Sequence, residues 1–259
     1  MTTGEPALRV AGVRHRFGER SSLEVLAGVD LEVGSGEFVS IVGPSGCGKS
    51  TLLRLIAGLI RPQRGRVLVG AEDVTQLSER ALFRVRRTLG MMFQGGALLD
   101  SMTVFENVAF PLREHTDLDE RAIADEVHDR LEAVGLHDVD GLLPGELSGG
   151  MVKRVALARA IIRSPAVLLC DEPFSGLDPI SVKRIEVLLG QINRARGITT
   201  LVVSHDIDST MRMAEHVLLL LPGGCFQGAP NELRASADPR VRAFLSRDLD
   251  PSMALPEAS

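Results

Sequence analysis

The sequence predicts an α/β protein built around a parallel sheet. A strand at 38–42 runs into a glycine-rich segment and then into a helix that begins at Lys49 and stops at Gly58. Short apolar runs typical of buried parallel strands follow and alternate with helices. Residues 103–163 show helical periodicity but no good strand signal. We therefore expect a helical subdomain inserted into the α/β core, with one more layer of crossover helices as the alternative.

The expected elements can be placed in chain order. The clearest helix runs from Asp178, an N-cap with Pro179 at the first helical position, to Arg196, with Gly197 as the stop. Another charged helix with one apolar face spans 118–134. Strands are expected at 38–42, 66–69, 90–93, 167–170, 199–203 and 217–221, and two short helices near 231–235 and 239–246.

Composition excludes several function classes. The 259 residues carry a net charge of −5 and no long basic run, so nucleic acid is not an expected partner. The three cysteines, Cys47, Cys170 and Cys225, lie far apart, which disfavours a zinc site or a disulfide framework and fits a reducing compartment. No apolar run approaches the roughly 18 to 20 residues that span a bilayer. By itself the chain is expected to be soluble and cytosolic.

Residues 43–51 match the P-loop pattern GxxxxGK[ST]. The glycines let the backbone curl so that successive N–H groups face one anion, and the helix starting at Lys49 adds its positive dipole end. Lys49 is expected to reach the β- and γ-phosphates of a nucleotide, and the Ser50 hydroxyl to bind Mg²⁺. An ordinary glycine-rich turn is the alternative. The expected nucleotide-binding residues are Gly43, Pro44, Ser45, Gly46, Cys47, Gly48, Lys49, Ser50 and Thr51.

Two acids, Asp171 and Glu172, follow the strand at 167–170. A P-loop needs an acidic partner for Mg²⁺ on a neighbouring strand, and Asp171 is expected to hold the ion through water. Glu172 is then placed to polarise the attacking water. Taken alone, two acids at a strand end are equally well explained as a solvated loop. The P-loop in the same chain favours the catalytic interpretation.

A second anion site is predicted at Leu147-Ser148-Gly149-Gly150-Met151, where small residues open a helix that runs to about 162. This run resembles the signature motif of ATP-binding-cassette (ABC) ATPases. Further likenesses to that family follow in its usual order. Gln94 resembles the Q-loop, Ser175 to Asp178 the D-loop, and His205 the H-loop.

The resemblance implies a P-loop NTPase core of ABC type, with an N-terminal antiparallel β subdomain and an inserted helical subdomain. The implied division is a core with the β subdomain over 7–102 and 164–229, a helical subdomain over 103–163 and a helical tail over 230–259. ATP and Mg²⁺ are the implied ligands, with Ser50, Gln94 and Asp171 holding the ion.

The resemblance also implies a mechanism. Two copies would pack head to tail, so that ATP on one P-loop is completed by Ser148, Gly149, Gly150 and Met151 of the other copy. Hydrolysis would remove the ATP that joins the two copies, so that the dimer opens. The implied catalytic residues are Glu172, His205, Lys49 and Gln94, and the D-loop residues are Ser175 and Asp178.

Two features depart from the family's usual pattern. Met151 stands where most members have Gln, which puts that side chain's polar contacts in doubt. The family usually stacks an aromatic residue, most often Tyr, on adenine about 25 residues before the P-loop. Aromatic residues are only 3% of this chain and Tyr and Trp are absent, so Phe17 is the expected platform. His15 is the weaker candidate, and a core role for Phe17 is the alternative.

The segment after Gln94 resembles the ATPase subunit of Mla/Mce-type phospholipid transporters, as do the signature and the run from Asp171 to Ile180. That resemblance implies a membrane permease, an MCE lipid-binding protein and a small STAS-type subunit as partners, at the cytoplasmic face of the bacterial inner membrane. The alternatives are an importer ATPase for a small polar solute such as an amino acid, and a soluble ABC ATPase outside transport. A groove for a permease helix would use Leu98, Leu99, Met102, Phe105 and Phe110, although some of these can instead be core.

Overall fold

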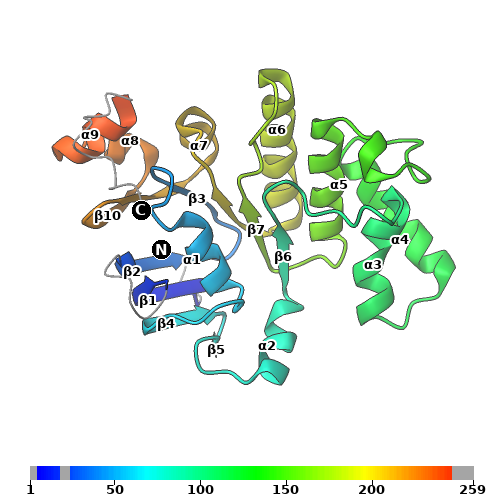
Figure 1. Ribbon diagram of the computed structural model, residues 1–259, viewed down its shortest axis with the longest axis horizontal. Helices are drawn as coiled ribbons and strands as arrows, with labels where there is room; N and C mark the ends of the chain where they lie inside the picture. The colour runs from blue at the N-terminus through cyan, green and yellow to red at the C-terminus, as the bar shows by residue number, and fades with distance from the viewer. Residues whose placement is uncertain (1–4, 18–23, 247–259) are drawn as a thin grey trace. The chain divides into compact units, whose positions relative to one another are not determined.

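The computed structural model describes residues 5–17 and 24–246 (Figure 1). The described chain divides into two compact units. One unit takes its residues from Met1–Arg86 and Thr199–Ser259, and the other is Arg87–Ile198. Within the described ranges, no helix has both the length and the apolar character needed to cross a membrane.

The first unit contains an antiparallel sheet near the N-terminus. Its strand order is β2-β1-β4-β5, formed by β1 (Leu8–Arg16), β2 (Glu24–Val33), β4 (Arg64–Val69) and β5 (Glu72–Asp73). Apolar side chains alternate with polar ones along β1, so one face of the strand is buried and the other is solvated. The expected N-terminal antiparallel β subdomain is confirmed.

A second set of strands in this unit has the order β10-β9-β3-β8. The strands β3 (Phe38–Val42), β8 (Thr199–Val203) and β9 (His216–Leu221) are parallel, and β10 (Gly224–Gly228) closes the edge as a hairpin with β9. Every residue of β3 and β8 is buried, as expected for parallel strands covered on both faces. Because β3 and β8 are parallel neighbours, the loops that follow them emerge at the same edge.

Five helices accompany the described strands of the first unit: α1 (Lys49–Ile56), α2 (Glu79–Arg86), α7 (Ile207–Met213), α8 (Pro230–Arg234) and α9 (Pro239–Ser246). The last two pack through Leu233, Val241 and Phe244 onto an apolar cluster that includes residues of β3 and β9. Burial of these side chains explains why two short helices persist near the C-terminus. Residues 247–259 of the predicted tail lie outside the described residues.

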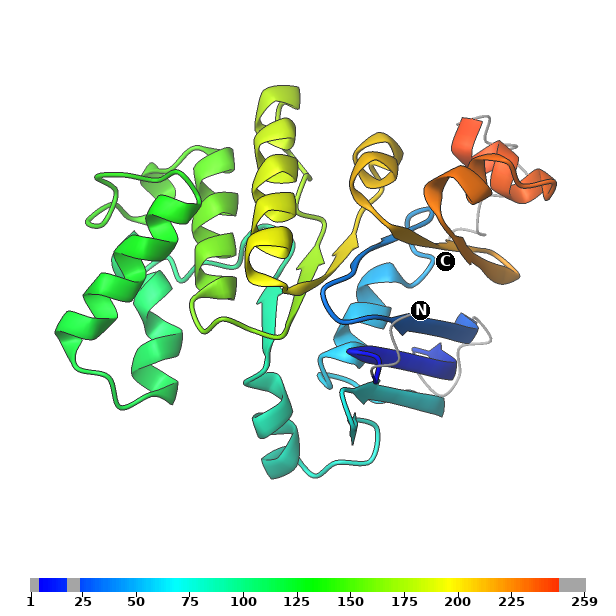
Figure 2. The same ribbon diagram turned by 180° about the vertical axis from the view of Figure 1, so that it is seen from behind.

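The second unit joins two parallel strands to a group of helices. The strands are β6 (Leu89–Met92) and β7 (Val167–Asp171). The helices are α3 (Val104–His115), α4 (Glu120–Ala133), α5 (Gly149–Ile161) and α6 (Pro179–Arg196), with a 3-10 turn at Pro144–Glu146. Helices α3, α4 and α5 contact one another, and Figure 2 shows them side by side. The predicted helical character of 103–163 agrees with these elements.

Local sequence signals explain where the helices of the second unit begin. Thr103 and Glu106 form a reciprocal capping box at α3, and Asp119 caps α4. The Asp178 carboxylate accepts hydrogen bonds from the backbone N–H groups of Ile180 and Ser181 at the start of α6. That helix ends at Gly197, whose φ of 63° is the left-handed C-cap conformation. The predicted bounds of α6 are therefore confirmed, whereas the proposed division into subdomains stays a prediction.

Candidate functional site

The loop between β3 and α1 contains a position, Gly48, whose backbone conformation and close neighbours require glycine. Gly48 has a φ of 99°, and a Cβ there would lie 2.7 Å from a methyl group of Leu26 and 2.9 Å from one of Val25. Gly48 is also the N-cap of α1, and no side chain among the described residues caps that helix start. The positive end of the α1 helix dipole lies at this point and favours negative charge there.

Lys49 is fixed in this loop by two main-chain carbonyl groups. Its Nζ atom lies 2.8 Å from the carbonyl oxygen of Gly43 and 3.0 Å from that of Pro44. The Lys49 side chain is buried. Thr51 is buried, and Ser50 is half-buried. The predicted phosphate-binding residues are therefore brought together by one strand, one loop and one helix.

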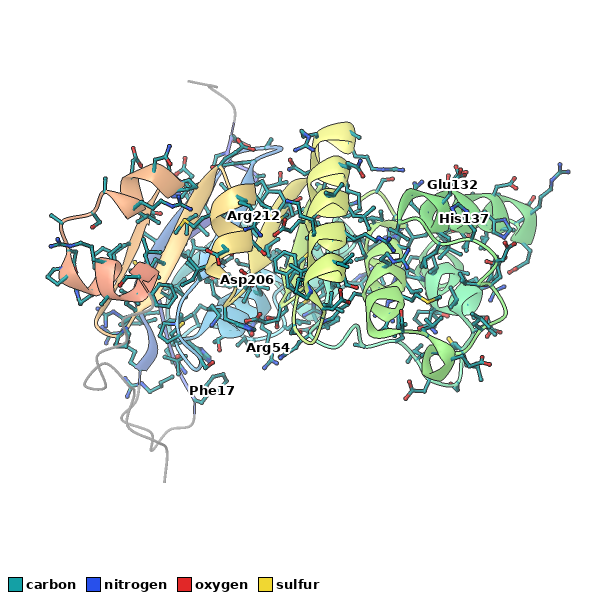
Figure 3. All side chains as sticks on the ribbon, turned by 90° about the horizontal axis from the view of Figure 1, so that it is seen from above. Phe17, Arg54, Glu132, His137, Asp206 and Arg212 are labelled. Carbon is teal, nitrogen blue, oxygen red and sulfur yellow. The ribbon has the colours of Figure 1, made fainter. Side chains whose placement is uncertain are left out.

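His205 emerges at the same edge as this loop. The register pairs Ile41 of β3 with Val203 of β8, and the Ser204 N–H donates to the Ile41 carbonyl at 3.1 Å. Ser204 is fully buried, and its hydroxyl accepts a hydrogen bond from the Asp206 N–H at 2.9 Å. Asp206, labelled in Figure 3, caps α7. These contacts fix the backbone on both sides of the exposed His205 side chain.

Phe17 directly follows β1 and is 51% exposed (Figure 3). The ring of His15 meets it edge to face, with 5.0 Å between the centroids and 87° between the planes. His15 itself is buried. Phe17 therefore has exposed ring surface that a nucleotide base can use, whereas His15 supports it from the buried side of the strand.

The second unit carries the acids and Gln94 at one edge of its strand pair. Met92 of β6 pairs with Cys170 of β7 in a parallel register, so Gln94 and the pair Asp171 and Glu172 follow the same ends of two adjacent strands. Both carboxylates are buried, whereas Gln94 is exposed. Glu172 has a φ of 50°, the left-handed conformation that is unusual for a residue with a Cβ.

The predicted signature forms the start of α5. Ser148 is the N-cap, and its hydroxyl accepts a hydrogen bond from the Met151 N–H at 3.3 Å. Ser148 and Gly149 are exposed, and Met151 is half-buried. A Cβ on Gly150 would lie 3.2 Å from the Ser181 hydroxyl oxygen, so glycine permits the close approach of α5 to α6. The helix start is therefore open to an anion from outside this chain.

The predicted D-loop runs from β7 into α6. The Ser175 hydroxyl donates to the carbonyl of Glu172 at 2.9 Å. The Asp178 carboxylate accepts hydrogen bonds from the Ser181 hydroxyl at 2.5 Å and from the Ser181 N–H at 3.0 Å. These hydrogen bonds hold the pKa of Asp178 below its ordinary value. Both residues thus stabilise a fixed turn directly after the acids.

Two cations on α5, the buried Lys153 and the half-buried Arg159, were not predicted as site residues from the sequence. The Nζ atom of Lys153 lies 3.2 Å from the Glu172 carbonyl oxygen and 3.2 Å from the Ser175 hydroxyl. Burial lowers the pKa of Lys153, and the neighbouring carboxylates of Glu172 and Asp171 oppose that shift. Arg159 donates to the carbonyls of Gly96 at 2.8 Å and Ala97 at 2.9 Å, just after Gln94. The signal available for Lys153 was a charged residue next to the buried apolar run Val155–Ala158 of α5.

The segment after Gln94 presents apolar side chains on a stiff loop. Leu99 and Phe110 are exposed, whereas Leu98, Met102 and Phe105 are half-buried. A buried amide, also missed from the sequence, organises the loop. Asn107 accepts a hydrogen bond from the Leu99 N–H at 2.8 Å and donates to the carbonyls of Leu99 and Met102.

Comparisons with known proteins agree with these motifs. The model of the family described as ABC transporter matches residues 26–175. The chain is 42% identical over 233 residues to the intermembrane phospholipid transport system ATP-binding protein MlaF of Haemophilus influenzae, covering 90% of this chain and 88% of that protein. It is 45% identical over 218 residues to MlaF of Escherichia coli K12, covering 84% and 81%. A probable ribonucleotide transport ATP-binding protein, mkl of Mycobacterium leprae, is 39% identical over 241 residues, covering 93% and 69%.

Solved structures give the same result. The dimeric post-hydrolysis structure of the ATP-binding cassette MJ0796 bound to ADP and Pi has a TM-score of 0.75 and 33% identity, covering 82% of this chain and 94% of that one. The structure of cbiO1 from Clostridium perfringens has a TM-score of 0.81 and 28% identity, covering 95% and 100%. The predicted ABC-type fold and the likeness to the phospholipid-transport ATPases are confirmed. The chain belongs to the ABC transporter family and is an ATP-hydrolysing cassette of that family.

Proposed function

We propose that this chain is the ATPase subunit of a transporter that moves phospholipid between the inner and outer membranes of a bacterial envelope. The observation that carries the proposal is the identity of 42–45% to two MlaF proteins, over more than four fifths of each chain. Such coverage includes the phosphate loop, the acids and the signature together. Transport supplies the reason for an ATPase with an exposed apolar loop, because hydrolysis must be passed to a membrane protein.

The chain's own groups support a division of catalytic labour. Lys49 and the N–H groups of the P-loop bind and neutralise the phosphates, and His205 contacts the γ-phosphate. Glu172 accepts a proton from the attacking water, and Gln94 orients that water. The ring of Phe17 stacks on adenine. Each role matches a position found above, at a loop or strand end where the backbone is fixed.

The chemistry of the donors fits Mg²⁺. Ser50, Gln94 and Asp171 offer a hydroxyl, an amide oxygen and a carboxylate, which are the hard oxygen ligands that Mg²⁺ prefers. Asp171 is buried at the end of β7, where a carboxylate is stabilised by a cation. When bound, the ion neutralises charge on the β- and γ-phosphates.

The exposed start of α5 supports action as a homodimer. Ser148 and Gly149 present donors that the chain does not cover, and a second copy's ATP is a suitable anion for them. The similar cassette MJ0796 is itself a dimer with ADP and Pi bound. In the proposed head-to-tail dimer, each ATP lies between the P-loop of one copy and the signature of the other.

The remaining partners follow from the transport role. A permease helix would dock on the segment that bears Leu99 and Phe110, and an MCE lipid-binding protein and a small STAS-type subunit would complete the complex. The chain would then be peripheral, at the cytoplasmic face of the inner membrane. Transport of a small polar solute is the second candidate, and the 39% identity to a probable ribonucleotide transport protein favours it over a soluble ATPase outside transport.

Mass spectrometry of the tagged chain purified from native membranes tests the proposal. We expect a permease, an MCE protein and bound phospholipid to co-purify. As a control, another tagged ATP-binding cassette from the same membranes should bring its own permease without that phospholipid. Recovery of a permease with a polar-solute-binding protein and no phospholipid would favour the second candidate. Recovery without any permease would contradict a transport role.

A further inference from the structure

The carbonyl oxygen of Glu172 accepts hydrogen bonds from three donors. The Ser175 N–H lies 3.3 Å away, the Ser175 hydroxyl 2.9 Å and the Lys153 ammonium 3.2 Å. The two Ser175 donors are local, because the residue lies three positions along the same turn. Lys153 comes from a different element, the helix α5. One main-chain atom is therefore held both by its own turn and by a neighbouring helix.

The conformation of Glu172 explains why such support is needed. Its φ of 50° lies in the left-handed region, where the Cβ of an ordinary residue is crowded. Residues keep this conformation only when their surroundings impose it. The backbone at Glu172 sets the direction in which its carboxylate leaves the chain. Contacts on the Glu172 carbonyl thus also orient the carboxylate.

The burial of the Lys153 ammonium group indicates a role beyond filling space in the core. The residue is only 4% exposed, and the residues Val155, Ala156 and Leu157 that follow it in α5 are apolar and buried. A buried ammonium is unfavourable unless it is hydrogen-bonded, and an apolar side chain of similar size avoids that cost. A lysine at this position therefore contributes less to folding stability than an apolar residue would, but it links α5 to the segment that carries Glu172.

We propose that Lys153 is a positioning residue for ATP hydrolysis, which holds the backbone of Glu172 and thereby aims the carboxylate at the attacking water. The proposal rests on the proposed function, in which Glu172 is the general base. It also connects two ATP sites. Ser148, at the start of α5, contacts the other copy's ATP, while Lys153 on the same helix holds the base of its own site. Five residues of rigid helix, about 7.5 Å, separate the two positions.

The test compares Lys153→Met with Lys153→Arg in the full-length chain. We expect Lys153→Met to lower kcat about 10- to 100-fold, since a small misplacement of a catalytic group has that effect. The Kd for ATP, measured by calorimetry, should change less than about twofold, because no nucleotide contact is removed. Lys153→Arg keeps a buried cationic donor and should restore most of the activity. Should the Met variant not fold, Lys153→Gln takes its place.

Arg154→Met is the matched control. Arg154 is the next residue of α5 and also donates to backbone carbonyls, those of Val134 and Gly135, which are remote in sequence from Glu172. We expect this variant to keep kcat at the wild-type value. An equal loss of kcat in Arg154→Met would show a general effect on α5 and would overturn the proposal, as would a wild-type kcat in a folded Lys153→Met.

Combination with Glu172→Gln separates this inference from the proposed function. If Lys153 acts through the carboxylate, Lys153→Met should not lower the residual rate of Glu172→Gln any further. A further loss by the same factor would mean that Lys153 acts elsewhere, and the proposal would be wrong. If Glu172→Gln itself hydrolyses ATP at the wild-type rate, the assignment of Glu172 as the base fails, and this inference fails with it.

Discussion

Two polar residues, Lys49 and Asn107, are positioned by hydrogen bonds to main-chain carbonyl groups. Lys49 is held by two carbonyls of its own loop, and Asn107 by the carbonyls of Leu99, Met102 and Thr103. A side chain that is hydrogen-bonded to main-chain carbonyls keeps its position relative to that segment of backbone. Substitutions at these positions should therefore change function sharply without disturbing distant parts of the fold.

Removal of the P-loop lysine is the first residue-scale prediction. Lys49→Ala deletes charge-assisted bonds to phosphate, each of which contributes about 1.5–3 kcal/mol. We expect the Kd for ATP, measured by calorimetry, to rise about 10- to 100-fold. Arg54→Ala is the control, because Arg54 is an exposed cation on the same helix α1 (Figure 3). Unchanged affinity in Lys49→Ala would contradict the assignment of the phosphate site.

The half-exposed ring at the end of β1 gives a second prediction at this scale. Phe17→Ala should weaken ATP and GTP binding by similar amounts, about 1–3 kcal/mol, since stacking tolerates any base. Fluorescence titration with both nucleotides measures the effect. Phe83→Ala removes a similarly exposed ring from α2 and should bind both nucleotides normally. Full affinity in Phe17→Ala would show that adenine stacks elsewhere.

At the scale of elements, α5 connects three motifs of the second unit. Its first turn is the signature, Lys153 reaches the carbonyl after β7, and Arg159 reaches the loop after β6. The Arg159 guanidinium is half-buried, burial lowers its pKa, and it donates hydrogen bonds to the carbonyls of Gly96 and Ala97. Movement of α5 as a rigid helix would therefore affect Glu172 and the segment after Gln94 together.

A prediction about Arg159 belongs to this element. Arg159→Met removes two charged hydrogen bonds from the segment 93–98, each contributing about 1.5–3 kcal/mol. We expect backbone amides there, including that of Gly96, to exchange with deuterium at least about 10-fold faster. Mass spectrometry of the exchanged peptides gives the readout, with Arg154→Met as the control. If the amides of 93–98 in Arg159→Met exchange at the wild-type rate, the segment is stabilised without Arg159.

The elements also show what the sequence could predict. Strands β3 and β8 and the helices α6 and α9 have the bounds expected from continuous apolar runs, caps and stop signals, because these signals are local. Gln94 and Asp171 were grouped only because the resemblance to ABC ATPases implied it, and they lie at or just after the ends of two neighbouring parallel strands. Lys153 and Asn107 were missed because a single polar residue within a helix does not show which distant backbone atom it will contact. The φ of Glu172 was equally hidden, since only the folded surroundings impose it.

At the scale of the whole molecule, the residues proposed for ATP binding and those proposed for hydrolysis belong to different units of the chain. The P-loop, Phe17 and His205 lie in the first unit, and Asp171, Glu172, Gln94 and the predicted signature lie in the second. Binding and hydrolysis should therefore be separable by mutation. Lys49→Ala is expected to impair the first, and Glu172→Gln the second.

Glu172→Gln gives the final prediction, because it keeps the shape of the side chain but cannot accept a proton. Loss of a general base lowers kcat by about 10²- to 10⁴-fold. The P-loop is untouched, so the variant should bind ATP with wild-type affinity and accumulate as a closed dimer that wild-type protein reaches only transiently. Size-exclusion chromatography with light scattering, with and without ATP, measures that dimer. Ser148→Arg, which blocks the exposed start of α5, should abolish the dimer in the same background. A Glu172→Gln variant that binds ATP yet stays monomeric would exclude ATP as the bond between two copies.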